Sequence, residues 1–186
     1  MGDFQRNPKW PAWALLASLA FLSGCSNEQQ VEYDLPQSLC GIPVDRSVVE
    51  PLFPAGKELT QTGDSLTDGQ DQSSCSYLVD GSTVLSFSDQ RYEERLTARD
   101  VLMKTVPQSQ ASEISVASSG RVALYRGHAV GVADCSGLPS DVEGEESQSY
   151  AITVGIGNPK NWQEAQDKLT QFMKKFLPAA AKADGC

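Results

Sequence analysis

The sequence predicts an α+β domain in which helices pack against an antiparallel sheet and two disulfides staple the fold. Short segments of alternating apolar residues are separated by Gly, Asp and Pro, a pattern typical of strands linked by hairpins. Segments with apolar residues at helical spacing stand before, between and after the strands, which is not the regular alternation of a parallel sheet. The cysteines of the domain have no C-x-x-C spacing, which favours disulfides over a metal site.

The first half of the domain is expected to hold two helices and three strands. Asp45 is placed to cap a short helix that ends near Phe53. Asp80-Gly81 is a hairpin turn signal, and Thr97-Ala98-Arg99-Asp100 resembles a capping box, which predicts a second helix that stops before Pro107. The three strands are expected at 57–62, 76–79 and 83–88.

The second half is expected to hold further strands and a long helix. Arg126-Gly127-His128 is predicted to join two strands as a hairpin connection, and a polar acidic loop is expected over 136–148. Three strands are predicted at 113–117, 121–125 and 129–134. A fourth strand is predicted from the alternation of one buried face, which is formed by Tyr150, Ile152, Val154 and Ile156.

The final helix is expected to begin with Asn158 as its cap and Pro159 at its first position. Lys174 and Lys175 are expected in its last turns, where cations complement the helix dipole. We interpret its apolar stripe as core rather than as a ligand groove. The stripe consists of Trp162, Ala165, Leu169, Phe172, Met173 and Phe176.

The composition excludes several classes of function. The chain has 186 residues, a net charge of −9, one histidine and five cysteines. An acidic protein lacks the basic surface that releases counterions from nucleic acid, so no nucleic-acid partner is expected. A single histidine leaves little material for a His-rich catalytic metal site, and no Gly-rich phosphate loop is present, so no cofactor is expected.

The first 24 residues have the features of an export signal. Arg6 and Lys9 supply a basic start, and the apolar stretch over 10–21 is shorter than the ~20 residues that a membrane-spanning helix needs. Leu22-Ser23-Gly24-Cys25 resembles the lipobox of bacterial lipoproteins. The resemblance implies cleavage before Cys25 and a diacylglyceryl lipid on its sulfur. The alternative is an ordinary secretory signal followed by an accidental cysteine.

The chain is therefore expected to have three parts. Residues 1–24 form the cleaved signal peptide, 25–38 the lipidated cysteine and a polar tether, and 39–186 a single domain. The domain is expected at the extracytoplasmic face of the cell membrane. Its attachment should depend on the lipid, because the surface of the domain is acidic and two acyl chains hold stably.

The odd number of cysteines supports this division. If Cys25 carries the lipid, four cysteines remain, and in an oxidising compartment four cysteines predict two disulfides with three possible connectivities. We favour Cys40–Cys75, which ties the opening segment to an early strand. The second disulfide is then Cys135–Cys186, which fixes the last residue to the end of a strand.

Three features resemble a large family of actinobacterial envelope lipoproteins built on a domain of unknown function. They are Leu39-Cys40 before a short helix, Cys75-Ser76-Tyr77 at the start of a strand, and the amphipathic helix near the C-terminus. The resemblance covers most of 36–178 and implies a PsbP-like sandwich. The family usually carries tryptophan at the position of Tyr77, and it does not predict the second cysteine pair. It brings no catalytic residues, because it has no established activity.

The clearest enzymatic motif is Gly63-Asp64-Ser65-Leu66-Thr67-Asp68-Gly69, which is similar to the first block of GDSL hydrolases. In that family the serine is the nucleophile, and the base here would have to be His128. The residues before the block are polar, a Gly-x-Asn-Asp block is missing, and hairpin-linked strands do not match a parallel hydrolase sheet. An envelope esterase that uses Ser65 is therefore the alternative hypothesis, and 63–74 is expected to be a solvated loop.

Acidic clusters also raise the question of a cation site. An EF-hand loop that began at Asp64 would need an oxygen ligand at Leu66 and a glutamate at Cys75, and it has neither. The acidic residues in the 136–148 loop are more typical of a solvated loop than of a metal site. They are Asp141, Glu143, Glu145 and Glu146.

The leading hypothesis is a lipid-anchored binding or scaffolding module without enzymatic activity. Its partner would be a small apolar ligand, an envelope polymer or another envelope protein. A cleft between the sheet and the C-terminal helix is the expected ligand site. No residue in the sequence marks that cleft.

Overall fold

The computed structural model describes residues 31–67, 70, 72–139 and 146–186. The expected signal peptide 1–24, Cys25 and the residues up to 30 lie outside these ranges, as do Asp68, Gly69, Asp71 and the acidic residues between 140 and 145. Within the described ranges, none of the helices combines the length and the apolar character that a membrane span requires.

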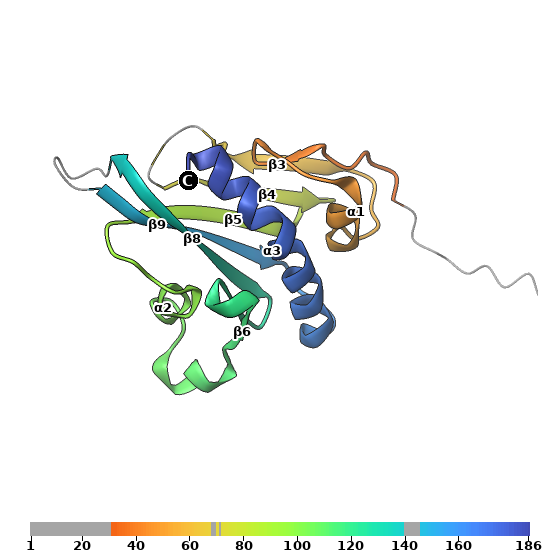
Figure 1. Ribbon diagram of the computed structural model, residues 1–186. Helices are drawn as coiled ribbons and strands as arrows, with labels where there is room; N and C mark the ends of the chain where they lie inside the picture. Colours follow the sequence, from red (N-terminus) through yellow and green to blue (C-terminus); the bar gives the residue numbers. More distant parts are fainter. Residues whose placement is uncertain (1–30, 68–69, 71, 140–145) are drawn as a thin grey trace, which may run out of the picture.

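Seven antiparallel strands form the main sheet, in the order β3-β4-β5-β9-β8-β7-β6 (Figure 1). The α+β class with an antiparallel sheet is therefore confirmed. The strands are β3 (Leu59–Gly63), β4 (Ser74–Val79), β5 (Ser82–Tyr92), β6 (Ser115–Ala117), β7 (Val122–Tyr125), β8 (His128–Pro139) and β9 (Glu146–Ile156).

The hairpin signals are confirmed, with two adjustments. Asp80 and Gly81 both have positive φ, 49° and 78°, as a two-residue type I′ turn requires. Tyr125 pairs with His128, so the second turn consists of Arg126 and Gly127 alone. The acidic loop expected over 136–148 is shorter than predicted, because β8 and β9 stay paired as far as Pro139 and Glu146.

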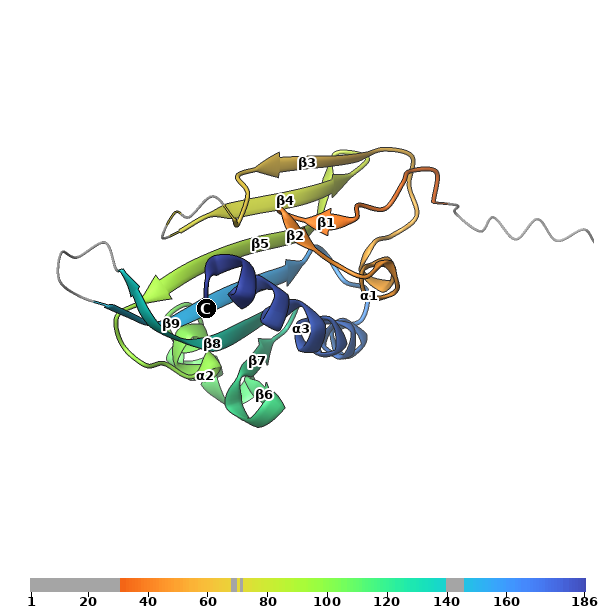
Figure 2. The same cartoon turned by 45° about the horizontal axis from the view of Figure 1, so that its top comes forward.

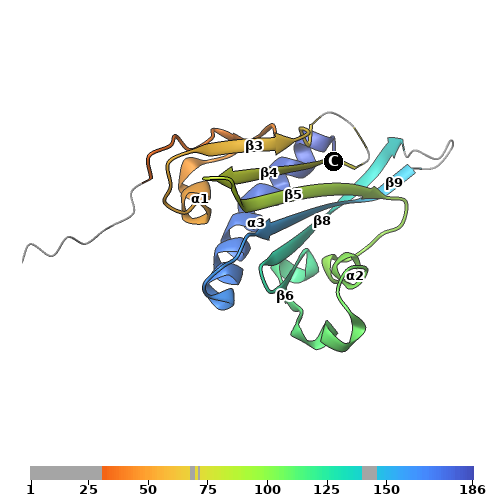
Figure 3. The same ribbon diagram turned by 180° about the vertical axis from the view of Figure 1, so that it is seen from behind.

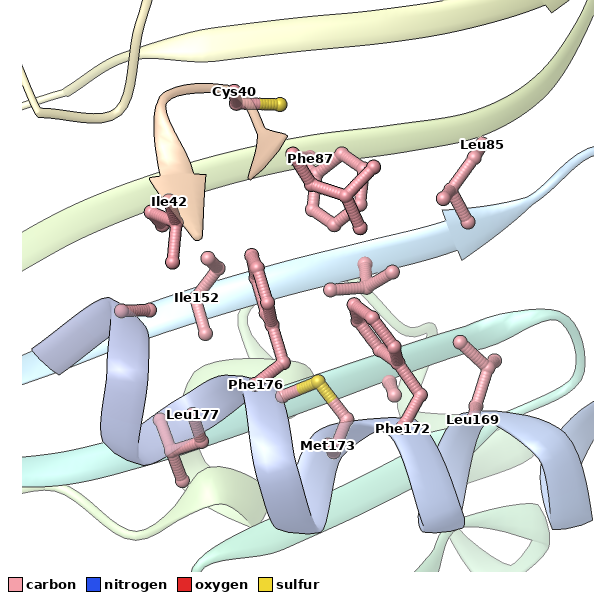
Figure 4. Close-up of a cluster of buried hydrophobic side chains, with 14 of the residues drawn as sticks. Cys40, Ile42, Leu85, Phe87, Ile152, Leu169, Phe172, Met173, Phe176 and Leu177 are labelled. Atoms are coloured by element: carbon pink, nitrogen blue, oxygen red, sulfur yellow. The ribbon is translucent and has the colours of Figure 1, made fainter. Parts of the chain in front are cut away.

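Helix α3 (Trp162–Asp184) crosses one face of the sheet and covers the larger core (Figure 2). Phe172 and Phe176 project from the helix toward Phe87 of β5, with ring centroids 6.2 and 5.3 Å away (Figure 4). The predicted buried face of β9 is confirmed for Tyr150, Ile152 and Val154, whereas Ile156 at the strand end is half-buried.

Helix α2 (Ala98–Met103) packs on the opposite face, against β7 and β8 (Figure 3). Its predicted capping box is confirmed, since Thr97 and Asp100 exchange backbone and side-chain hydrogen bonds. A 3-10 helix, η2 (Gln108–Glu113), occupies the residues before β6, so that strand is shorter than predicted. A second core lies under α2, formed by Ala98, Val101, Leu102, Val106, Ile114, Ala123, Tyr125, Val130, Val132 and Ala151.

The opening segment lies beside β4 on the α3 face. A small hairpin of β1 (Ser38–Leu39) and β2 (Ile42–Pro43) leads into α1 (Arg46–Val49) and a 3-10 turn, η1 (Glu50–Leu52). The predicted cap is confirmed, because the Asp45 carboxylate accepts a hydrogen bond from the Ser47 N–H at 2.9 Å.

The described part of the expected tether is packed on the domain. Val31 forms a β-bridge with Gly56. The ring of Tyr33 lies 6.5 Å from that of Phe53, and its hydroxyl donates a hydrogen bond to the carbonyl of Pro54. The tether is therefore shorter than the expected 25–38, because Tyr33 already packs on the domain through an aromatic contact and a hydrogen bond.

Both ends of α3 differ from the prediction. The cap is Asn161, whose side chain accepts hydrogen bonds from the N–H groups of Gln163 and Glu164. Asn158 cannot serve as the cap, because its φ of 40° lies in the left-handed region rather than the extended one that caps adopt. The helix also continues through Pro178 to Asp184, so Lys174 and Lys175 stand in its middle.

Both predicted disulfides are confirmed. Cys40 is bonded to Cys75 with a Cα–Cα distance of 6.1 Å, and Cys135 is bonded to Cys186 with a Cα–Cα distance of 4.8 Å. The first joins the β1–β2 turn to β4. The second joins Cys186, two residues beyond the end of α3, to β8, which fixes the C-terminal half of α3 against the sheet.

Candidate ligand-binding cleft

A cleft of about 610 Å³ lies between the C-terminal half of α3 and the sheet strands β7 and β8. We call it the α3 cleft. Its volume lies within the ~300–1,000 Å³ typical of small-molecule sites. The position agrees with the expected one between sheet and C-terminal helix.

The floor of the α3 cleft is apolar. Val122 of β7 and Ala133 of β8 face the helix residues Met173, Leu177 and Ala181 across it. The Met173 side chain is fully buried, and a flexible thioether adapts its shape to what packs against it. Val122, Leu177 and Ala181 are also buried, so the floor is the outer edge of the core, and it favours an apolar body.

The rim of the α3 cleft is cationic. Arg121, Lys174 and Lys182 line it and are exposed. Within the described ranges none of the three makes an ion pair with a carboxylate. The one acidic residue on the rim, Asp134, is 3.9 Å from Arg95. In a chain of net charge −9, three unpaired cations around one apolar floor form a local site for an anionic group.

The end of α3 closes the cleft. Gly185 has φ 92°, a left-handed conformation that glycine adopts without strain, and it turns the chain back at the helix end. The Cys186 N–H then donates to the Ala181 carbonyl at 2.8 Å. This reversal brings the Cys186 sulfur to Cys135 of β8, and Cys186 lines the cleft.

An ion pair beside the disulfide holds the same helix end. The Arg91 guanidinium donates to the two carboxylate oxygens of Asp184 at 3.0 and 2.8 Å, and to the Asp184 carbonyl at 3.3 Å. Asp184 is the last residue of α3, where a carboxylate opposes the helix dipole. The bidentate arginine offsets that repulsion and supplies hydrogen bonds to the buried carboxylate.

Asp89 is a second buried carboxylate near this helix end. Its side chain is on the α3 face of β5, 3% exposed, and accepts a hydrogen bond from the Ser73 N–H at 2.8 Å. Burial, together with the charge of Asp184, raises the pKa of Asp89 to about 6. The Tyr150 hydroxyl lies 3.5 Å from Asp89, and burial raises the pKa of Tyr150 far above its ordinary value.

This corner of the domain does not provide a metal site. Cys135, Cys186 and Asp184 bring their ligand atoms within 4.8 Å of one another. Both sulfurs are bonded to each other, however, and only a thiolate binds a metal strongly. The carboxylate of Asp184 is already engaged by Arg91.

The structure does not bring Ser65 and His128 together. Ser65 follows β3, and His128 begins β8. Three strands separate β3 from β8, which corresponds to about 19 Å across the sheet. The two side chains are also on opposite faces, since Ser65 contacts the Cys40 carbonyl on the α3 face while His128 lies over Gly155 beside Ser86.

The Ser65 hydroxyl takes part in local hydrogen bonds that hold a turn. It is placed to donate to the Cys40 carbonyl at 3.2 Å, lies 2.8 Å from the Thr67 hydroxyl, and accepts from the Thr67 N–H at 3.2 Å. These bonds close a short turn against the β1–β2 hairpin. A nucleophile needs a base within hydrogen-bond reach, and His128 does not provide one in this arrangement.

The cleft residues were missed by sequence reasoning for a simple reason. Arg121, Lys174 and Lys182 come from two distant segments, and each alone resembles an ordinary solvated cation. The disulfide between Cys135 and Cys186 was the available signal, because it predicts that the chain end packs on β8.

Comparison with protein-family models, curated proteins and solved structures found no match. The resemblance to the envelope lipoprotein family and to a PsbP-like sandwich stays a prediction.

Proposed function

We propose that this chain is an exported, lipid-anchored binding protein that holds an amphipathic anion in the α3 cleft. The lipid on Cys25 would keep the domain at the extracytoplasmic face of the cell membrane. The ligand would have an apolar body, such as an acyl chain, and one carboxylate or phosphate group. The activity is binding rather than catalysis.

The observation that carries this proposal is the combination of an apolar floor with an unpaired cationic rim. The floor of Val122, Met173 and Leu177 favours a group that water disfavours. The rim of Arg121, Lys174 and Lys182 favours an anion at the mouth. A purely apolar ligand would make no use of the three cations, and an inorganic anion would make no use of the apolar floor.

Two further observations support an exported location. The chain begins with a basic start, a short apolar stretch and Leu22-Ser23-Gly24-Cys25. Both disulfides join residues of the domain, and such bonds persist in oxidising compartments. The fifth cysteine, Cys25, is the lipobox position.

A displacement titration tests the ligand class. The probe is a dansyl-labelled undecanoate, compared with its uncharged methyl ester, on the unlipidated protein. The variant Arg121→Gln/Lys174→Gln/Lys182→Gln removes the rim charges. The matched control Arg46→Gln/Lys57→Gln/Lys160→Gln removes three exposed cations elsewhere.

We expect the rim variant to bind the carboxylate about tenfold more weakly, since three screened contacts of roughly 0.5 kcal/mol each are lost. The control should bind like the parent, and added salt should weaken only the carboxylate. Equal affinity for carboxylate and ester, or equal weakening in the rim variant and the control, would contradict the proposal.

A further inference from the structure

The strand registers place one set of turns and termini at a single end of the sheet. The β4–β5 turn at Asp80-Gly81, the β7–β8 turn at Arg126-Gly127 and the end of β9 at Ile156 all lie there. Helix α3 begins just beyond β9, and Val31 reaches the same end through its bridge to Gly56. We call this the tether end, because the first described residue of the domain lies on it.

A continuous surface connects Val31 with the start of α3. Val31 and Phe53 line one shallow hollow. Phe53 and Asn161, the cap of α3, line a second hollow of about 320 Å³. The first turn of α3 and the point where the chain enters the domain therefore lie at the same end of the sheet, and Figures 1 and 3 draw them at separate corners of that end.

Trp162 is the exposed aromatic residue of the tether end. Sequence spacing predicted that it belongs to the core, but it is 49% exposed. One part of the indole packs over Gly127, where an added Cβ would lie 2.7 Å from the ring atom Cζ3. Because Gly127 has no side chain, the ring packs directly on the backbone of the turn, and the rest of the ring is exposed to solvent.

The length of the preceding chain limits where the membrane can be. Six residue steps separate Cys25 from Val31, and a fully extended chain of that length spans about 20 Å. A lipid on Cys25 therefore keeps the tether end close to the bilayer. The α3 cleft begins at Met173, 11 residues beyond Trp162, and a helix rises by about 1.5 Å per residue.

We propose that Trp162 inserts into the headgroup region of the bilayer that holds Cys25, so that the α3 cleft opens away from the membrane. This inference rests on the proposed lipid anchor. Tryptophan is the residue that favours the membrane interface, because its ring is apolar and its N–H is a donor. Lys160, two residues earlier, is exposed beside it and suits an anionic headgroup.

The contact orients the domain and does not replace the lipid as its attachment. With the tether end on the bilayer, the cleft takes its ligand from the aqueous side of the envelope and not directly out of the lipid layer. The bilayer is therefore the partner of one end of α3, and the amphipathic anion is the ligand of the other.

Fluorescence tests the inference, because Trp162 is the only tryptophan of residues 25–186. The native lipoprotein is reconstituted into vesicles of phosphatidylcholine and phosphatidylglycerol, with or without acyl chains brominated near the headgroup. Flotation of the vesicles is measured on the same samples. The matched control carries Trp162→Phe together with Ala183→Trp, which moves the reporter to an exposed position at the far end of α3.

We expect the protein to float, and Trp162 to shift to the blue and lose most of its emission with brominated lipid. The reporter at position 183 should keep its emission and stay accessible to acrylamide. A protein that floats while Trp162 remains unquenched would overturn this inference and leave the anchor standing. A protein that does not float would overturn the anchor and, with it, this inference.

Discussion

The hydroxyl of Tyr77 accepts a hydrogen bond from the backbone N–H of Cys40, with 3.0 Å between the two heavy atoms. The same hydroxyl lies 2.8 Å from the Gln61 side-chain oxygen, to which it donates. A tryptophan at this position could only donate. The tyrosine therefore holds the β1–β2 turn and its disulfide in a way that an indole does not.

Tyr77→Phe should lower the free energy of unfolding by about 1–3 kcal/mol, because the buried Cys40 N–H loses its acceptor. Urea unfolding of the oxidised protein measures the change. Tyr92→Phe is the control, since the Tyr92 hydroxyl bonds the exposed Gln90 side chain. A loss no larger than that of the control would show that the Tyr77 hydroxyl does not hold the turn.

Asp89 makes stability depend on pH in a defined window. Its pKa is raised from 3.8 to about 6, so the folded protein binds a proton more readily than the unfolded chain between these values. The stabilising contribution of protonated Asp89 is complete below pH 3.8 and is lost as the pH rises through 6.

Asp89→Asn keeps the acceptor for the Ser73 N–H and removes the charge. It should stabilise the protein at pH 7.5 by up to about 3 kcal/mol and leave it almost unchanged at pH 4. Urea unfolding across this range measures both. Equal effects at the two pH values would contradict the assignment of a raised pKa to Asp89.

The Cys135–Cys186 disulfide should contribute to both stability and binding. Cys135→Ala/Cys186→Ala opens a loop with a sequence separation of 51, which costs about 4 kcal/mol in the chain-entropy model. Because Cys186 lines the α3 cleft, this variant should also bind the dansyl-labelled undecanoate more weakly.

Cys40→Ala/Cys75→Ala is the matched control for that comparison. Its disulfide closes a loop with a sequence separation of 35, on the other side of the core. It should lower stability by a similar amount and leave the affinity of the folded protein unchanged. Equal losses of affinity in both variants would show that ligand binding in the α3 cleft does not depend specifically on the Cys135–Cys186 disulfide.

Cys25→Ser removes the thiol that would carry the lipid. We expect the variant to lose labelling by a radioactive fatty acid and to move from the membrane fraction to the soluble one. Ser26→Ala is a conservative neighbouring control and should remain in the membrane fraction. Unchanged partitioning of the Cys25 variant would contradict the anchor.

Local signals in the sequence predicted much of the fold. The Thr97 capping box, the Asp80-Gly81 turn and the alternation along β9 each depend on residues a few positions apart, and each is confirmed. The predicted start of α3 was wrong because Asn158 and Asn161 are both residues that can cap a helix. Only the backbone conformation, set by the end of β9, distinguishes them.

The remaining differences arise from long-range contacts. Helix α3 continues past Lys175 and through Pro178. Burial of Leu177 and Ala181, the Arg91–Asp184 pair and the last disulfide offset the hydrogen bond that the proline removes. Trp162 has core spacing, yet the sheet has already ended at its level and only the Gly127 turn lies beneath it. The cationic rim required residues 121 and 182 to meet in space, which no local pattern encodes.

Methionine methyl NMR tests the central claim most directly. Residues 25–186 contain two methionines, Met173 on the floor of the α3 cleft and Met103 on α2. In a titration of the ¹³C-methyl-labelled protein with dodecanoate, the Met173 signal should shift and saturate while the Met103 signal stays in place. A Met173 signal that remains fixed, or that moves only in step with Met103, would contradict binding in the α3 cleft.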